Sequence, residues 1–133
     1  MRCSFCSFCL TWLLVACVTS TTREFFPSPE NPRYTPERGS HAVREYLRLR
    51  CPELKPPKRD SATIFARVRV DTSGKATSAE LTGTSGDDIM DGVIGTVAAQ
   101  LDLAANTPRR AEYRASIAYA CRDTVAARIT VAP

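Results

Sequence analysis

The sequence "ARVRVDTSGKATSAEL", residues 66–81, is the feature that most limits how this chain can fold. Apolar residues alternate with arginines before Asp71 and with polar residues after Gly74, which is the period of strands with one buried face. Between the two runs, Asp71 can bond backbone N–H groups and Gly74 accepts a positive φ. The stretch therefore predicts an antiparallel hairpin, and the rest of the chain must cover its apolar face.

The segments after this hairpin predict one helix and then one or two strands. Ser85 begins a run with acids in its first turn, after which apolar residues recur at helical spacing as far as Leu101. Alternation returns at 113–121 and again at 125–131. The pattern leaves open whether the second of these runs forms a fourth strand.

A further helix is predicted before the hairpin, over about residues 40–50. Thr35 supplies a capping hydroxyl and Pro36 suits the first helical position, while Gly39-Ser40 is expected to delay the start. The order of elements predicts an α+β fold. We expect a two-layer sandwich with a small antiparallel sheet (β-β-α-β, with or without a fourth strand), one packed helix and a preceding N-terminal helix.

Two glycines, Gly92 and Gly95, interrupt the helix predicted after Ser85. Each costs about 1 kcal/mol of helix stability relative to alanine. They either permit close approach by another backbone or form a tolerated, exposed face of small residues. The second interpretation is favoured.

The N-terminus is typical of an exported protein. "MRCSFCSFCLTWLLVAC" carries one charge and an apolar run far shorter than the roughly 20 residues of a membrane-spanning helix. Leu14-Val15-Ala16-Cys17 resembles the lipobox of bacterial lipoproteins, which predicts cleavage before Cys17 and lipidation there; ordinary secretory cleavage and an uncleaved anchor are the alternatives. The expected organisation is a signal peptide (1–16), a proline-rich flexible tether (17–34) and a folded domain (35–133).

The cysteines support export and predict one disulfide. The C-x-x-C-x-x-C run at 3–9 has the spacing of iron–sulfur ligands, but it lies in the segment expected to be removed. Cleavage leaves Cys17, Cys51 and Cys121. If Cys17 carries lipid, one pair remains in an oxidising compartment, which predicts a Cys51–Cys121 disulfide. Two buried free thiols are the alternative.

Charge is distributed unevenly along the chain, although the net charge is only +4. Residues 33–59 carry eight basic side chains, whereas 87–102 carry four aspartates and no basic group. Such segments either complement each other or turn a basic face toward a membrane or an acidic partner. We favour solvated surface with some intramolecular pairing.

Three stretches together resemble a known family. They are "ARVRVDTSGKATSAEL", "TSGDDIMDGVIGTVAAQL" with Asp91, and "TPRRAEYRASIAYA", which stand in the order strand, glycine turn, strand, helix, closing strand. Over residues 62–121, about half of the chain, this order and spacing are similar to the TonB C-terminal domain family. The resemblance implies a periplasmic binding fold.

In that family, an extended segment of an outer-membrane receptor pairs beside the closing strand. The resemblance therefore implies partner-strand pairing at Tyr113, Arg114, Ala115, Ser116, Ile117, Ala118 and Tyr119. The expected partner is an envelope protein, such as an outer-membrane receptor segment, and the expected location is the periplasm, lipid-anchored to the outer rather than the inner membrane. A strand at 124–131 would cover this edge. The alternative is then a structural or assembly lipoprotein of the envelope without a transport role.

No catalytic constellation is predicted. His41 is the only histidine, and no serine lies in a nucleophile elbow. Asp87 and Asp88 are explained as helix-start acids, and no metal-ligand spacing surrounds them. We therefore expect a non-enzymatic protein with no cofactor, no metal, no nucleic acid and no small-molecule substrate.

Overall fold

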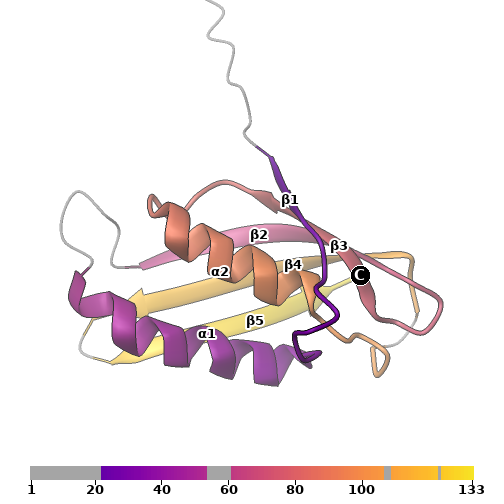
Figure 1. Cartoon of the computed structure of the whole chain (residues 1–133), viewed down its shortest axis with the longest axis horizontal. Helices are drawn as coiled ribbons and strands as arrows, with labels where there is room; N and C mark the ends of the chain where they lie inside the picture. Colours follow the sequence, from indigo (N-terminus) through magenta and orange to yellow (C-terminus); the bar gives the residue numbers. More distant parts are fainter. Residues whose placement is uncertain (1–21, 54–60, 107–108, 123) are drawn as a thin grey trace, which may run out of the picture.

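The computed structural model describes residues 22–53, 61–106, 109–122 and 124–133 (Figure 1). The predicted signal peptide and Cys17 lie outside these described residues. In chain order the elements are β1 (Arg23–Phe25), α1 (Pro36–Arg50), the short 3-10 helix η1 (Cys51–Glu53), β2 (Ser61–Val70), β3 (Ala76–Thr82), α2 (Asp88–Ala99), β4 (Glu112–Cys121) and β5 (Val125–Ala132).

The five strands form one antiparallel sheet in the order β1-β3-β2-β4-β5. The predicted hairpin is β2 with β3, and Ala66 lies opposite Leu81. At its turn Gly74 has a φ of 85°, and a Cβ there would lie 2.6 Å from the Cα of Ala104. Glycine is therefore required at this position. The α+β class is confirmed, but the described sheet has five strands instead of the expected three or four, because β1 was not foreseen.

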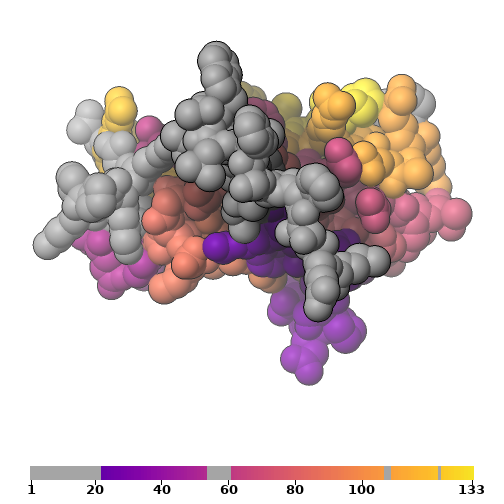
Figure 2. Space-filling model, turned by 90° about the horizontal axis from the view of Figure 1, so that it is seen from above, coloured from indigo at the N-terminus to yellow at the C-terminus, as the bar shows by residue number. Residues whose placement is uncertain are grey.

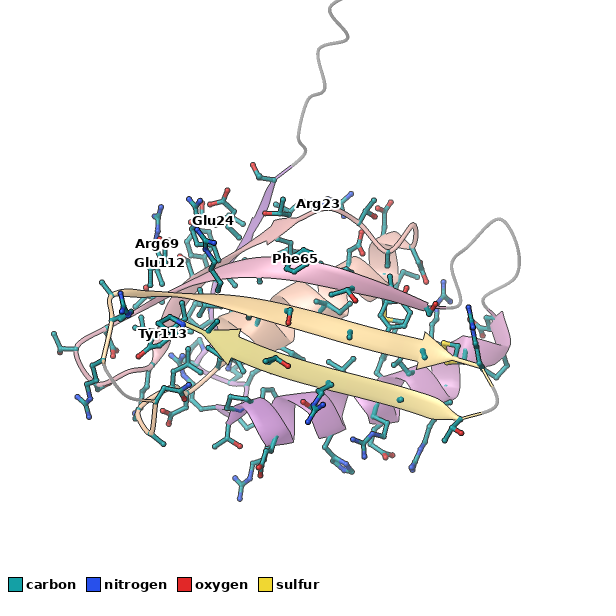
Figure 3. The ribbon with its side chains drawn as sticks, turned by 180° about the vertical axis from the view of Figure 1, so that it is seen from behind. Arg23, Glu24, Phe65, Arg69, Glu112 and Tyr113 are labelled. Atoms are coloured by element: carbon teal, nitrogen blue, oxygen red, sulfur yellow. A yellow bond between two sulfur atoms is a disulfide. The ribbon has the colours of Figure 1, made fainter. Side chains whose placement is uncertain are left out.

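Both helices lie on the same side of the sheet, in front of it in Figure 1 and behind it in Figure 3. Alternate strand side chains point toward the helices and are buried. The core combines Val43 and Leu47 of α1, Met90 and Ile94 of α2, and Ile64, Val68, Leu81 and Ile117 of the sheet. The opposite side, here called the open face, carries the exposed side chains of Thr63, Phe65, Arg67, Arg69, Arg114 and Ala118.

Helix α1 begins earlier than expected, at Pro36 instead of near residue 40. Its cap is the predicted one, since the Thr35 hydroxyl accepts a hydrogen bond from the Arg38 N–H at 3.3 Å. Gly39 does not delay the helix. A Cβ at Gly39 would lie 2.9 Å from the Ile129 side chain, so this glycine lets α1 pack closely against β5.

Residues 22–34 are part of the folded domain, so the prediction of a flexible tether over 17–34 is wrong for this stretch. β1 pairs with β3, and the chain that follows is held by the fully buried side chain of Gln100. This amide accepts from the Ser28 N–H at 2.7 Å and donates to three backbone carbonyls between 28 and 32. One buried amide thus satisfies main-chain groups of Ser28, Asn31 and Pro32 in this irregular stretch, and Tyr34 pairs with the backbone of Gln100 and Asp102.

The two helix glycines have different environments. Gly95 is buried, and the ring of Phe25 occupies the space into which a Cβ would project, whereas nothing lies within 4 Å of a Cβ at Gly92. The favoured interpretation, a tolerated small face, therefore holds for Gly92 alone. Viewed from above, the indigo residues of β1 lie beside the orange residues of α2, where Arg23 and Asp88 form an ion pair at 2.9 Å (Figure 2).

Candidate functional site

The strand predicted to bind a partner, residues 113–119, lies in the interior of the sheet. It is part of β4, which pairs with β2 on one side and with β5 on the other. Ile117, for example, stands opposite Ile64 of β2 and Ile129 of β5. The prediction that Tyr113, Arg114, Ala115, Ser116, Ile117, Ala118 and Tyr119 pair with a partner strand is therefore wrong. The reason is that β5 follows β4 directly in the sequence and occupies that edge.

The predicted disulfide is confirmed. Cys51 and Cys121 are bonded across 70 residues of sequence, and their Cα atoms lie 5.4 Å apart. Cys51 opens η1 at the end of α1, and Cys121 is the last residue of β4. The bond therefore ties the C-terminal end of α1 to the sheet.

Next to the disulfide, Arg50 joins the two helices. Its Nε and Nη2 donate to the carboxylate of Asp87 at 2.9 and 3.2 Å, and its Nη1 donates to Glu53 at 2.5 Å. The hydrogen bonds that it donates to Asp87 raise the pKa of the Arg50 guanidinium above its ordinary value. Asp87 also caps α2 by accepting from the Ile89 N–H. At this point the basic and acidic segments of the chain pair internally, as favoured from the sequence.

The buried Asp91 supports the loop before α2. Its side chain accepts from the N–H of Ser85 at 2.8 Å and from the hydroxyls of Ser85 and Thr84 at 2.5 Å each. These donors explain its burial without a ligand. The exposed His41 lies apart on α1, and the described residues contain no group of three or more His, Cys, Asp or Glu suited to a metal ion.

The open face has a charged end and a small-residue end. At the charged end, Glu112 forms ion pairs with Arg67 at 3.3 Å and with Arg69 at 3.7 Å. Figure 3 shows Arg69 and Glu112 side by side at this end of the sheet. Phe65, two residues before Arg67 on the same face of β2, is 58% exposed. At the other end is a shallow hollow of about 340 Å³, lined by Ser61, Ala62, Thr63, Ala118, Tyr119, Ala120, Ala126, Ala127 and Arg128. Five of its lining residues are alanines, which have no polar or charged group with which to bind a specific ligand.

A larger depression lies between α1 and the outer edge of β5, and we call it the α1–β5 groove. Its volume is about 820 Å³. The Ser40 hydroxyl donates to the Pro36 carbonyl within α1 at 2.7 Å and accepts from the Ile129 N–H of β5 at 2.8 Å, which joins the helix to the strand. The lining residues are Pro36, Glu37, Ser40 and Arg44 of α1, Asn106, and Ala127, Arg128, Ile129, Thr130 and Val131 of β5. This surface combines a sheet edge with charged side chains.

Sequence reasoning missed this groove. Ser40 and Arg44 are four residues apart and so share one face of α1, which was a usable signal. The signal is weak, because the helix was expected to begin only near Ser40 and nothing in the sequence places β5 beside this face. The sequence of β5 does not show that this strand lies at a sheet edge, since apolar and polar residues alternate in the same way in edge and interior strands.

Neither α1 nor α2, the α-helices in the described part of the chain, has the length and apolar character needed to cross a membrane. Comparison with protein-family models, with curated proteins and with solved structures finds no match to this chain. A function must therefore be argued from the chain's own residues.

Proposed function

We propose that this chain is a non-catalytic, lipid-anchored interaction protein of the bacterial cell envelope, with a structural or assembly role. The observation that carries the proposal is the Cys51–Cys121 disulfide, because such bonds persist in the periplasm and are rare in the cytosol. The lipobox-like sequence ending at Cys17 supports the same location. The buried Asp87 and Asp91 are engaged by protein donors, which is the pattern of structural carboxylates.

The distance between the proposed anchor and the folded domain supports a role close to the membrane. Residues 18–22, five in number, separate Cys17 from the first residue of β1. A fully extended chain spans at most about 3.5 Å per residue, so this spacer reaches roughly 20 Å. A domain held so closely is suited to contacts at the membrane surface, and the outer membrane is the proposed site of anchoring.

A TonB-like module linked to outer-membrane transport is the second candidate. The order β2, β3, α2, β4 favours it, because this is the order on which the resemblance rests. The position of β5 weighs against it, since the edge of β4 that would receive a receptor segment is covered. The structural or assembly role is therefore preferred.

We also infer a two-layer arrangement, with α1 and α2 as one layer and the sheet as the other. The sheet then offers three surfaces to an envelope-protein partner: the open face, the edge at β1 and the edge at β5. The β1 edge is only three residues long and offers few main-chain groups. The longer β5 edge is the better candidate for a protein contact.

Expression of the complete precursor in a bacterial host tests the anchor. We expect the mature protein to begin at Cys17, to carry diacylglycerol there by intact mass, and to sediment with membranes. The Cys17→Ala variant should lose membrane association but retain the Cys51–Cys121 bond in non-reducing peptide maps. A wild-type protein that keeps Met1, or that lacks lipid on Cys17, would contradict the proposal.

A further inference from the structure

The two edges of the sheet leave little room for an added strand. The β1 edge is three residues long, and α1 covers the middle of the β5 edge, where the Ile129 N–H bonds to Ser40. The open face has no such cover from the described helices, because both lie behind the sheet in Figure 3. It also exposes the aromatic side chain of Phe65. The open face is therefore the side of the sheet on which a partner has room to dock.

A row of four charged side chains crosses the open face, one from each of four neighbouring strands. Glu24 of β1 lies directly opposite Glu80 of β3. Arg67 of β2 lies directly opposite Glu80 on one side and Arg114 of β4 on the other. Directly opposite residues share a face of the sheet, so all four lie on the face of the exposed Arg67. We call this set the charged row, and from β1 to β4 it reads acid, acid, base, base.

Each half of the charged row contains a like-charge pair. Like charges that lie directly opposite each other in a sheet repel, and this applies to Glu24 with Glu80 and to Arg67 with Arg114. Arg67 has an ion pair with Glu112. Within the described residues Glu24, Glu80 and Arg114 form no ion pair. A partner that presents the inverse order of charges would remove the repulsion in both halves.

We propose that the open face binds a second copy of this chain, with the two sheets face to face and related by a two-fold axis. An axis that runs along the strands, between β3 and β2, places Glu24 of each copy over Arg114 of the other. The same rotation places Glu80 over Arg67 and brings the two Phe65 rings together beside the axis. An axis across the strands at this row would place each charge over its equal in the other copy, and repulsion disfavours it.

An anionic membrane surface and an acidic segment of another protein are the competing occupants. Arg67 and Arg114 would attract either of them, but Glu24 and Glu80 of the same row would repel it. A second copy meets all four charges with the opposite sign, so the charged row favours it. The inference goes beyond the proposed function, because it names the chain itself as a partner and does not require the lipid anchor.

Sedimentation equilibrium of the disulfide-bonded chain with Cys17→Ala tests the dimer without any lipid. We expect the mass to rise from that of one chain to that of two with increasing protein concentration. The all-basic row Glu24→Arg/Glu80→Arg and the all-acidic row Arg67→Glu/Arg114→Glu should each weaken self-association at least roughly tenfold. An equimolar mixture of these two variants should dimerise again, because every charge then meets one of opposite sign.

Two further variants control for net charge and for folding. Arg38→Glu/Arg44→Glu on α1 makes the same change in net charge as the all-acidic row but lies on the other side of the sheet. It should change self-association less than about twofold. Arg114→Glu alone alters one exposed side chain and should weaken self-association roughly threefold. It decides the question if a double variant of the row loses the circular dichroism spectrum of the wild type.

A chain that stays monomeric at its highest soluble concentration would overturn the proposal, as would dimers that the row variants do not weaken. Two folded row variants that fail to dimerise when mixed would overturn the two-fold arrangement. Binding of anionic vesicles by a monomeric chain, abolished in Arg67→Glu/Arg114→Glu, would identify a membrane surface as the occupant. Lipidation at Cys17 is measured separately, so loss of the dimer leaves the proposed anchoring intact, and an unlipidated chain that dimerises refutes the anchoring alone.

Discussion

At the scale of single residues, Asp71 organises the turn between β2 and β3. Its carboxylate accepts from the N–H and hydroxyl of Ser73 at 2.9 and 2.6 Å and from the N–H of Lys75 at 3.0 Å. The Ser73 hydroxyl, followed by the Lys75 N–H, lowers the pKa of Asp71 below its ordinary value. Because the pKa of Asp71 is lower in the folded than in the unfolded protein, its ionised carboxylate stabilises the fold. This stabilisation is fully present above the unfolded pKa of about 3.9. It is lost as the pH falls through the folded pKa.

We therefore predict an NMR titration midpoint for the Asp71 carboxyl below about 3.9. Between pH 5 and pH 2, urea unfolding should show a larger loss of stability for the wild type than for Asp71→Asn, which has no carboxylate to protonate at this position. A midpoint at or above 3.9, or identical pH profiles for the two proteins, would rule out this role for the turn aspartate.

At the scale of elements, the contact between α2 and β1 depends on Gly95. The Phe25 ring fills the space of its missing Cβ, so Gly95→Ala should displace β1 and lower the free energy of unfolding by about 1 to 2 kcal/mol. At Gly92 of the same helix a Cβ would meet no neighbouring atom, so Gly92→Ala should instead raise the free energy of unfolding by up to about 1 kcal/mol. Urea denaturation measures both. In a Phe25→Ala background Gly95→Ala should become stabilising, and a persistent loss there would show that the ring is not the cause.

At the scale of the whole molecule, the Cys51–Cys121 bond closes a long loop between the end of α1 and the end of β4. On the chain-entropy account, a loop of this length stabilises the fold by roughly 4 kcal/mol. The Cys51→Ala/Cys121→Ala variant should lose about that much in urea unfolding, and reductant should lower the midpoint of the wild type but not of the variant. A wild-type midpoint that is insensitive to reductant would contradict a stabilising role for the bond.

The sequence by itself determined the local elements of this protein and one long-range bond. The hairpin at 66–81, the helix after Ser85 and the strand at 113–121 follow from side-chain periodicity, which is set by backbone geometry within each segment. The same periodicity allowed a further strand at 125–131 but left its formation open. The Cys51–Cys121 pairing followed from counting the cysteines that remain after cleavage. These inferences needed no knowledge of which segments are neighbours in space.

Only the tertiary structure decided which strands form the edges of the sheet. Alternation marks Tyr113 to Tyr119 as a strand, but it is the same whether the next strand comes from this chain or from a partner. The pairing of β5 with β4 closed the edge that resemblance had assigned to binding, and it created the groove beside Ser40 and Arg44. Likewise, the hydrogen bond between Ser28 and Gln100 and the packing of Phe25 against Gly95 hold residues 22–34 in the folded domain. Such contacts join residues far apart in sequence, and local periodicity carries no information about them.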